Sequence, residues 1–271
     1  MIIAKSKEEL DKALKQLSLK PGKLALIPTM GNLHEGHLSL IKMAKLHSTK
    51  TITTIFVNPL QFGKNEDFNE YPRTIETDVE KLKNENCDVL FIPKNKNEMF
   101  YEKEKLKKIE SGELGKELCG KIRPDHFDGV LTVVYRMFYI INPDNAIFGA
   151  KDYQQQVLIK SMAKFYFPKL EILTAPIVRS SNGIALSSRN NYLSSKELEL
   201  ASNLFKSLQQ SISLYKNGIS EQDVIQKGID FLISKNLTPD YYVLRDNFLE
   251  KSVKIACIQN LQQESGATSL K

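Results

Sequence analysis

The chain has 271 residues, three cysteines and a formal net charge of +6 at pH 7. This length is enough for one large or two modest domains with a substantial core. No apolar stretch reaches the roughly 20 residues of a membrane-spanning helix, and the N-terminus lacks the basic and then apolar order of a signal peptide. The scattered cysteines indicate a reducing compartment without a disulfide framework. We therefore expect a cytoplasmic protein that does not bind membranes.

The first part of the chain alternates between predicted strands and predicted helices. Strands are predicted where short apolar or β-branched runs end at turn residues, and helices where apolar residues recur at helical spacing. This alternation predicts an α/β fold: a Rossmann-like parallel sheet with helices on both faces. The predicted elements are strand 24–27, helix 36–47, strand 51–57, helix 74–84, strand 89–92, buried helix 131–141, strand 145–148, helix 153–165 and strand 170–174.

The pattern changes near Pro176. Residues 177–186 predict a hairpin around Asn182-Gly183, followed by helices over 195–216 and 221–235 and a strand-like run at 241–244. Ser194 and Glu197 have the spacing of a capping box at the start of the first of these helices. We therefore predict two domains, residues 1–176 and a smaller C-terminal α+β domain over 177–271.

The most informative motif is Pro-Thr-Met-Gly-Asn-Leu-His-Glu-Gly-His at 28–37, directly after the first strand of the alternating pattern. It predicts a glycine-containing turn and a helix start with His34, His37 and free backbone N–H groups. Such a site favours phosphate, and imidazole N–H groups can donate to a phosphorus-bound oxygen as charge develops on it. The alternatives are a zinc site, for which the chain offers few further ligands, and histidines that only decorate the helix start.

Amides and a guanidinium follow the next predicted strand. Asn58 and Gln61 lie in the segment 56–62, where their amides suit a polar substrate. The alternative is an Asn-Pro turn with a surface glutamine. Arg73 precedes Thr74, the predicted N-cap of the helix 74–84. Its guanidinium suits either a substrate carboxylate or an ion pair within the loop.

Charged residues also precede the apolar helix. Arg123 and His126 suit an anion, whereas Asp128 is predicted as the N-cap of that helix. Lysines gather between 94 and 108 with glutamates among them. Because aromatic residues are not interleaved with these lysines, the cluster indicates a solvated face rather than a nucleic-acid surface.

A second strand-to-helix junction lies at 148–156. Gly149 permits a close backbone approach, and Lys151 suits a phosphate. Asp152 suits either a helix cap or a ribose hydroxyl, and Gln155 suits the same crevice as Gln61. The alternative is a capped helix with a surface lysine.

The loop Leu186-Ser187-Ser188-Arg189-Asn190 offers two hydroxyls and a guanidinium. These donors suit the β- and γ-phosphates of ATP. The alternative is a serine-rich linker.

The His-x-Gly-His element after a strand resembles the signature of the nucleotidyl-transfer superfamily, which includes class I aminoacyl-tRNA synthetases and cytidylyltransferases. The chain as a whole is similar to the pantothenate synthetase (pantoate–β-alanine ligase) family, because six segments follow one another in the order of its signature segments. Ala150 departs from the acidic residue common there, and 252–260 match the family's closing segment only weakly. The six segments are 28–37, 56–62, 71–74, 123–130, 149–155 and 186–190.

The resemblance implies a two-step ligation driven by ATP. The pantoate carboxylate attacks the α-phosphate of ATP to give pantoyl adenylate and pyrophosphate. The β-alanine amine then attacks the acyl carbon and releases AMP and pantothenate. The implied small-molecule partners are pantoate, β-alanine and ATP, with Mg²⁺ bridging the phosphates through water and phosphate oxygens. A homodimer is also implied, with neither a nucleic acid nor a membrane as partner.

The resemblance also implies which residues form the site. His34, His37, Lys151 and Arg189 are the implied catalytic residues, with His37 as proton donor. Gln61 and Gln155 are implied to hold pantoate, and Asn58 is expected to bind substrate beside Gln61. The implied ATP contacts are Met30, Gly31, Asn32, Leu33, His34, Glu35, Gly36, His37, Gly149, Ala150, Lys151, Asp152, Val178, Leu186, Ser187, Ser188 and Arg189.

Two other functions fit parts of the sequence. Another adenylate-forming or cytidylyl-transferring enzyme of the same superfamily would act on a different acid or on CTP; Gln61 and Gln155 within matching segments argue against it. A basic RNA-binding protein on a nucleotide-binding fold would bind RNA in a strongly salt-dependent way. The sequence offers no interleaved aromatic surface for that function.

Overall fold

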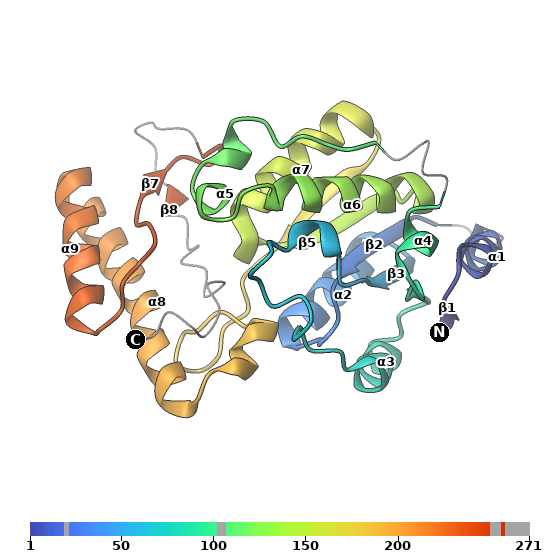
Figure 1. The fold of residues 1–271 in the computed structure, drawn as a ribbon, viewed down its shortest axis with the longest axis horizontal. Helices are drawn as coiled ribbons and strands as arrows, with labels where there is room; N and C mark the ends of the chain where they lie inside the picture. Colours follow the sequence, from blue (N-terminus) through green and yellow to red (C-terminus); the bar gives the residue numbers. More distant parts are fainter. Residues whose placement is uncertain (19–21, 102–106, 250–255, 258–271) are drawn as a thin grey trace. The chain divides into compact units, whose positions relative to one another are not determined.

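The computed structural model describes residues 1–18, 22–101, 107–249 and 256–257 (Figure 1). They belong to two compact units, residues 1–150 with 158–176, and residues 151–157 with 177–271. The predicted domains, 1–176 and 177–271, differ from these units over 151–157. Part of the reason is Tyr153, whose hydroxyl donates to the carbonyl of Asn247 at 3.0 Å within the second unit.

The first unit is built on a six-stranded sheet with the order β1-β4-β3-β2-β5-β6. Every neighbouring pair in this sheet is parallel. This confirms the predicted Rossmann-like α/β fold, although the sequence analysis did not anticipate β1 or the helix after it. The strands are β1 (Ile2–Ala4), β2 (Leu24–Thr29), β3 (Lys50–Ile55), β4 (Val89–Phe91), β5 (Asn145–Gly149) and β6 (Glu171–Ala175).

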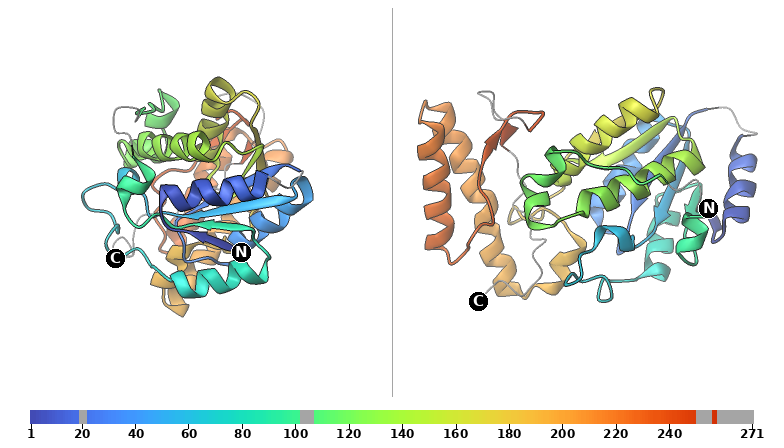
Figure 2. Two further views of the ribbon diagram at one scale, coloured as in Figure 1. Left: turned by 90° about the vertical axis from the view of Figure 1, so that its right-hand side faces the viewer. Right: turned by 45° about the horizontal axis from the view of Figure 1, so that its top comes forward.

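Helices cover both faces of this sheet because successive strand residues point to opposite faces. In β2, Leu26 packs into one hydrophobic cluster, whereas Ala25 and Ile27 pack into the other. The first cluster contains residues of α1 (Lys7–Ser18), α6 (His126–Ile141) and α7 (Tyr153–Tyr166). The second contains residues of α2 (Glu35–His47) and α3 (Ile75–Asn84). Figure 2 shows α6 and α3 on opposite sides of the sheet.

The chain changes direction across the sheet between β2 and β5. It runs from β2 outward through β3 to β4, and later returns to the other side of β2 with β5 and β6. In open α/β sheets, ligands bind beyond the carboxyl ends of the strands at such a switch point. The turn after β2 and Ala150 after β5 both lie there.

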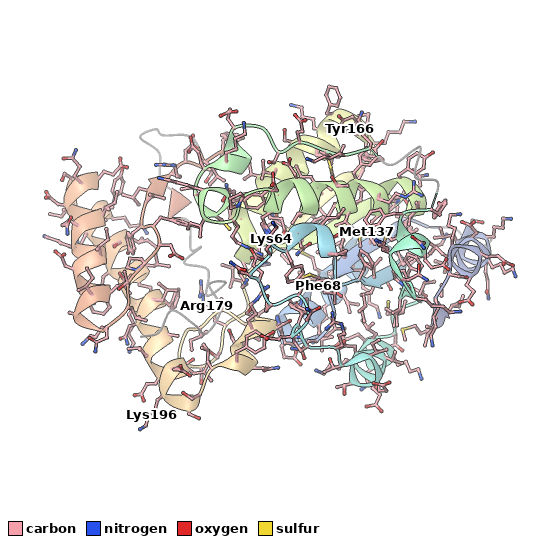
Figure 3. The ribbon with its side chains drawn as sticks, in the orientation of Figure 1. Lys64, Phe68, Met137, Tyr166, Arg179 and Lys196 are labelled. Atoms are coloured by element: carbon pink, nitrogen blue, oxygen red, sulfur yellow. The ribbon has the colours of Figure 1, made fainter. Side chains whose placement is uncertain are left out.

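The apolar helix α6 begins earlier than the predicted 131–141, and almost all of it is buried. Its internal cation Arg136 is 2% exposed. The guanidinium donates to the carbonyls of Met99 and Tyr101 and lies over the Tyr101 ring. The sulfur of Met137, labelled in Figure 3, accepts from the Thr54 hydroxyl of β3 at 3.6 Å. No helix among the described residues is long and apolar enough to span a membrane.

Of the two predicted helix caps, one is confirmed in position and one is wrong. Thr74 is the N-cap residue of α3, but its hydroxyl makes no capping bond and donates instead to the Asn32 side chain at 3.4 Å. The N-cap of α6 is Asp125 rather than Asp128. Asp128 lies in the first turn, where its carboxylate accepts from the backbone N–H and hydroxyl of Ser111 at 2.8 and 2.6 Å. In both cases the side chain forms a hydrogen bond with a residue that is distant in sequence instead of capping the helix.

Short helical segments connect the longer elements of both units. Pro59–Gln61 (η1) follows β3, and Asn58 caps it. Ser188–Tyr192 (η5) begins after Ser187 in the second unit. The others are α4 (Lys96–Met99), η3 (Leu114–Lys116), α5 (Cys119–Ile122) and η4 (Ala150–Asp152).

The second unit contains two long helices, α8 (Ser195–Lys216) and α9 (Glu221–Ser234), which lie side by side (Figure 1). The predicted capping box at the start of α8 is confirmed. The Ser194 hydroxyl accepts from the Glu197 N–H, and the Glu197 carboxylate accepts from the Ser194 N–H at 2.7 Å. The core between the helices includes Leu208, Leu232 and Tyr242.

The strands of the second unit are short. The predicted hairpin forms around Gly183, which has φ +91°, with a bridge between Arg179 and Ala185. β7 (Leu244–Arg245) pairs antiparallel with β8 (Ala256–Cys257), so the strand predicted at 241–244 begins only at its last residue. Most of the segment 252–260 lies outside the described residues.

We expect Tyr242→Phe to lower the free energy of unfolding by about 1–2 kcal/mol, because it removes a buried hydroxyl to which two serine hydroxyls are bonded. That hydroxyl lies 2.7 Å from Ser211 Oγ and 3.1 Å from Ser207 Oγ. Thermal unfolding measures the change, and Tyr215→Phe at a less buried position of α8 is the control. Equal unfolding temperatures for Tyr242→Phe and the unchanged protein would contradict this role.

Candidate active site

The turn after β2 requires two residues that tolerate left-handed backbone. Gly31 has φ +86° and Asn32 has φ +48°. Glycine adopts this conformation freely, and asparagine does so more readily than most residues. The Thr29 hydroxyl donates to the Thr54 carbonyl at 2.8 Å and accepts from the Gly31 N–H at 3.2 Å. The end of β2 and the start of the turn are therefore joined to β3.

The same turn is held from α3. The Asp78 carboxylate is fully buried and accepts from two successive N–H groups, those of Asn32 at 2.9 Å and Leu33 at 2.8 Å. The ammonium group of Lys81 donates to the Leu33 carbonyl. Sequence analysis missed Asp78 and Lys81. The signal available was a carboxylate beside the apolar face of an amphipathic helix, which alone does not identify its partner.

His34 and His37 cap α2 reciprocally, which confirms the prediction that both lie at its start. His34 is the N-cap, and its Nδ1 accepts from the Gly36 N–H at 3.1 Å. His37 Nδ1 accepts from the His34 N–H at 3.3 Å. The ring centroids are 4.0 Å apart. Because each Nδ1 accepts a hydrogen bond, each neutral ring carries its proton on Nε2 and offers that N–H as a donor.

Free N–H groups are predicted at this turn, but five of its backbone N–H groups already have acceptors. The N–H groups of Gly31, Asn32, Leu33, His34 and Gly36 all donate to acceptors within the protein. Backbone donors that are not bonded in a strand or helix find other partners when buried, and here side chains supply them. Most of the backbone donors of this turn are therefore already used within the protein.

Gln61 lies beside the turn. Its Nε2 donates to the Met30 sulfur at 3.2 Å, and its Oε1 accepts from Asn58 Nδ2 at 3.0 Å. Asn58 is 1% exposed and also donates to the Gly129 carbonyl of α6 at 3.1 Å. A Cβ on Gly129 would lie 2.0 Å from the Leu60 carbonyl oxygen, so glycine allows α6 to approach η1. The structure thus brings together the first two predicted site segments.

Arg123 and His126 hold the backbone of Gln61 in place. The Arg123 guanidinium pairs with Glu66, with Nε 2.9 Å from Oε1, and lies 3.1 Å from His126 Nε2. His126 Nδ1 donates to the Gln61 carbonyl at 2.8 Å. Burial raises the pKa of the Glu66 carboxyl, but the hydrogen bond and charge of Arg123 outweigh burial and leave that pKa below its ordinary value. Glu66 was not anticipated from the sequence.

Arg73 binds backbone carbonyl groups, a contact that the sequence analysis did not predict. Its guanidinium donates to three backbone carbonyls, those of Phe68, Asn69 and Tyr71, at 2.9 to 3.0 Å. It therefore braces the loop before α3 through carbonyl groups rather than through an ion pair.

The remaining predicted residues divide between the units. Gly149 ends β5 and Ala150 begins η4, both in the first unit, whereas Lys151, Asp152 and Gln155 belong to the second. Lys151 Nζ lies 3.0 Å from the Asp152 carboxylate, which therefore pairs with its neighbour. Gln155 is half-buried on the first turn of α7.

The serine loop also belongs to the second unit. The Leu186 N–H donates to the Val178 carbonyl at 2.9 Å, so two of the predicted ATP contacts are adjacent. Ser187 caps η5, its hydroxyl accepting from the Arg189 N–H at 3.3 Å, and Ser188 is buried. Next to Val178 is Arg179, which is labelled in Figure 3. The Arg179 guanidinium lies 4.0 Å from the centre of the Phe205 ring and donates to the Gly183 carbonyl at 3.0 Å. The loop is thus an ordered turn rather than a simple linker.

No group of three or more His, Cys, Asp or Glu side chains placed to hold a metal ion occurs in the described part of the chain. His34 and His37 use one ring nitrogen each as a helix cap. These observations count against the zinc alternative for the two histidines.

The chain is similar over most of its length to one family of known proteins. The model of the family described as pantoate-beta-alanine ligase matches residues 2–267. Pantothenate synthetase of Thermoanaerobacter sp. (strain X514) is 44% identical over 234 residues, which cover 86% of this chain and 82% of the relative. That of Shewanella woodyi is 40% identical over 248 residues, covering 91% and 88%.

Solved structures show the same similarity. Pantothenate synthetase from Thermus thermophilus superposes with a TM-score of 0.86 at 34% identity, over 94% of this chain and 91% of that one. Pantoate-beta-alanine ligase from Francisella tularensis, complexed with beta-gamma ATP and beta-alanine, has a TM-score of 0.78 at 35% identity, over 89% and 88%. Since the family match spans almost the whole chain and the relatives align over most of their own length, this chain belongs to the pantoate–β-alanine ligase family.

Proposed function

We propose that this chain condenses pantoate with β-alanine, using ATP, and that activation of the pantoate carboxylate takes place at the 31–37 turn. Family membership supports the overall reaction. The observation that supports the location is the pair of histidine caps, which place the protons of two neutral imidazoles on Nε2 at the start of α2, just after Met30, the residue that Gln61 contacts. Phosphate oxygens are stabilised by donors in this position.

In the first step, a pantoate carboxylate oxygen attacks the α-phosphorus of ATP as the bond to pyrophosphate breaks. Negative charge grows on the phosphoryl oxygens, and we propose that the Nε2–H groups of His34 and His37 donate to them. Such preorganised donors stabilise the transition state without a covalent intermediate on the protein. Positioning and charge stabilisation supply most of the catalysis of phosphoryl and nucleotidyl transfer.

In the second step, the β-alanine amine attacks the acyl carbon of the adenylate. AMP leaves with the electron pair of the broken acyl–phosphate bond, and the amine loses a proton. We propose that Gln61 and Gln155 hold pantoate, with Asn58 acting mainly through Gln61. The contact from Asn58 Nδ2 to Gln61 Oε1 supports this, because it leaves Gln61 Nε2 to donate toward the turn.

We propose that the cations Lys151 and Arg189 of the second unit bind the phosphates of ATP, with the hydroxyls of Ser187 and Ser188. Guanidinium and ammonium groups are the usual protein partners of phosphates. Mg²⁺ would be held chiefly by phosphate oxygens and water, which is its common mode at nucleotide sites. The carboxylate bonded directly to the turn, Asp78, already accepts from two N–H groups.

We also propose a cytoplasmic homodimer. The buried cysteines Cys87 and Cys119 suit a reducing compartment, and the dimer follows from the family resemblance. Sedimentation of the full chain tests the dimer. The alternative function, RNA binding on a nucleotide-binding fold, gives no reason for the two histidines that cap α2.

The order of chemistry is tested by isotope exchange. Labelled pyrophosphate should exchange into ATP when pantoate is present and β-alanine is absent, because adenylate formation is reversible before the amine arrives. Exchange that requires β-alanine, or that proceeds without pantoate, would contradict the two-step route.

We expect His37→Ala to slow adenylate formation about a hundredfold to a thousandfold, because one preorganised donor is lost, and to change ATP binding much less. Single-turnover formation of pantoyl adenylate gives the rate, and equilibrium binding of a non-hydrolysable ATP analogue gives the affinity. His47→Ala, at the far end of α2, is the matched control. A normal single-turnover rate in His37→Ala would remove His37 from the mechanism.

Arg189→Ala should slow adenylate formation but leave the reaction of preformed pantoyl adenylate with β-alanine nearly unchanged. The reason is that pyrophosphate, the group that Arg189 is proposed to bind, has already left before the second step. Each half-reaction is measured separately, with Arg179→Lys as a comparison at a cation that packs on Phe205. Equal losses in both half-reactions would assign the guanidinium another role.

A further inference from the structure

Asp78 is an unexpected residue to find under a phosphate-binding turn. Its side chain is fully buried, and both of its oxygens accept hydrogen bonds from the turn. Burying a carboxylate is costly unless it is well hydrogen-bonded, and its negative charge opposes a nearby polyphosphate. Because burial and repulsion both disfavour a carboxylate here, we expect its hydrogen bonds to the turn to perform a function.

The contacts made from α3 and its N-cap indicate that role. Thr74, Asp78 and Lys81 are spaced so that they lie on one side of the helix. All three contact residues 32–33: Thr74 reaches the Asn32 side chain, Asp78 two N–H groups and Lys81 the Leu33 carbonyl. The turn is also packed tightly, since a Cβ on Gly31 would lie 3.2 Å from Asp78 Oδ2 and 3.0 Å from the Ile55 side chain.

These contacts decide which donors the turn presents. Asp78 occupies the N–H groups of Asn32 and Leu33 at the point where the backbone is left-handed. The next residues of the same turn direct the Nδ1 atoms of His34 and His37 inward to backbone N–H groups. Consequently the N–H groups at 32 and 33 are occupied, and the neutral forms of both imidazoles carry their proton on Nε2.

We propose that Asp78 is the positioning residue of this turn: its carboxylate holds the backbone of residues 32–33 so that the two imidazoles present their Nε2–H groups to the phosphate. The effect on catalysis rests on the proposed function of the histidines, whereas the effect on ring geometry does not. Asp78 itself does not touch the substrate in this account. It acts by fixing the conformation that the reactive donors need.

The first test is Asp78→Asn, which keeps the shape but replaces one acceptor by an NH₂ donor facing an N–H. We expect kcat for adenylate formation to fall about tenfold to a hundredfold, since small displacements of a positioned group have effects of this size. The KM for ATP should change much less. Glu80→Gln, at an exposed position of the same helix, is the matched control and should behave as the unchanged protein.

The second test reads the imidazoles directly. Nitrogen chemical shifts of isotope-labelled histidine distinguish an Nε2–H ring from an Nδ1–H ring. We expect both rings to be Nε2–H in the unchanged protein and a mixture of tautomers in Asp78→Asn. If the variant keeps both tautomers and its kcat, Asp78 serves stability alone and the proposal is overturned. If the tautomers shift but adenylate formation does not slow, the positioning role stands and the proposed catalytic role of the histidines fails.

A third measurement needs no substitution, so it decides the matter even if Asp78→Asn does not fold. A non-hydrolysable ATP analogue with Mg²⁺ is added to the unchanged protein, and backbone amide and imidazole resonances are followed. The Asn32 and Leu33 amide signals should move little, because they stay bonded to Asp78, while the imidazole signals should move. Large shifts of both amides toward phosphate-bonded positions would overturn the proposal.

Discussion

The need to satisfy every buried backbone N–H governs the centre of this structure. The turn between β2 and α2 leaves the regular ladder of the sheet, so its N–H groups require other acceptors. Thr29 at the end of β2, Asp78 of α3 and the two histidines at the start of α2 provide them. These hydrogen bonds restrain the backbone of a glycine-containing segment.

The sheet topology explains why these particular segments meet. β2 lies between β3 and β5, and the chain changes direction across the sheet at that place. Residues that follow β2 and β3 therefore lie at one edge of the sheet, where Gln61 reaches Met30. Helix α6 completes the arrangement because Gly129 allows it to approach η1 and to accept from Asn58.

A chain of polar contacts supports the proposed pantoate residue in the same way. Glu66 orients Arg123, Arg123 contacts His126, and His126 holds the Gln61 backbone. Since the carbonyl of Gln61 can only accept, His126 carries a proton on Nδ1 and presents Nε2 as an acceptor to Arg123. Gln61 and the backbone at 31–33 are thus held by side chains that do not themselves belong to the proposed reaction.

The sequence by itself determined the alternation of strands and helices, the histidines at the start of α2, the capping box of α8 and the family resemblance. These features are local, because they depend on residue spacing within one element or one turn. The tertiary structure alone decided the partners of the polar side chains. Asp78 lies 46 positions from Asn32, Glu66 lies 57 positions from Arg123, and Asp128 turned to Ser111 rather than capping its helix. Hydrogen bonds of this kind form only when packing of the apolar faces has brought distant elements together, and a local pattern does not contain that information.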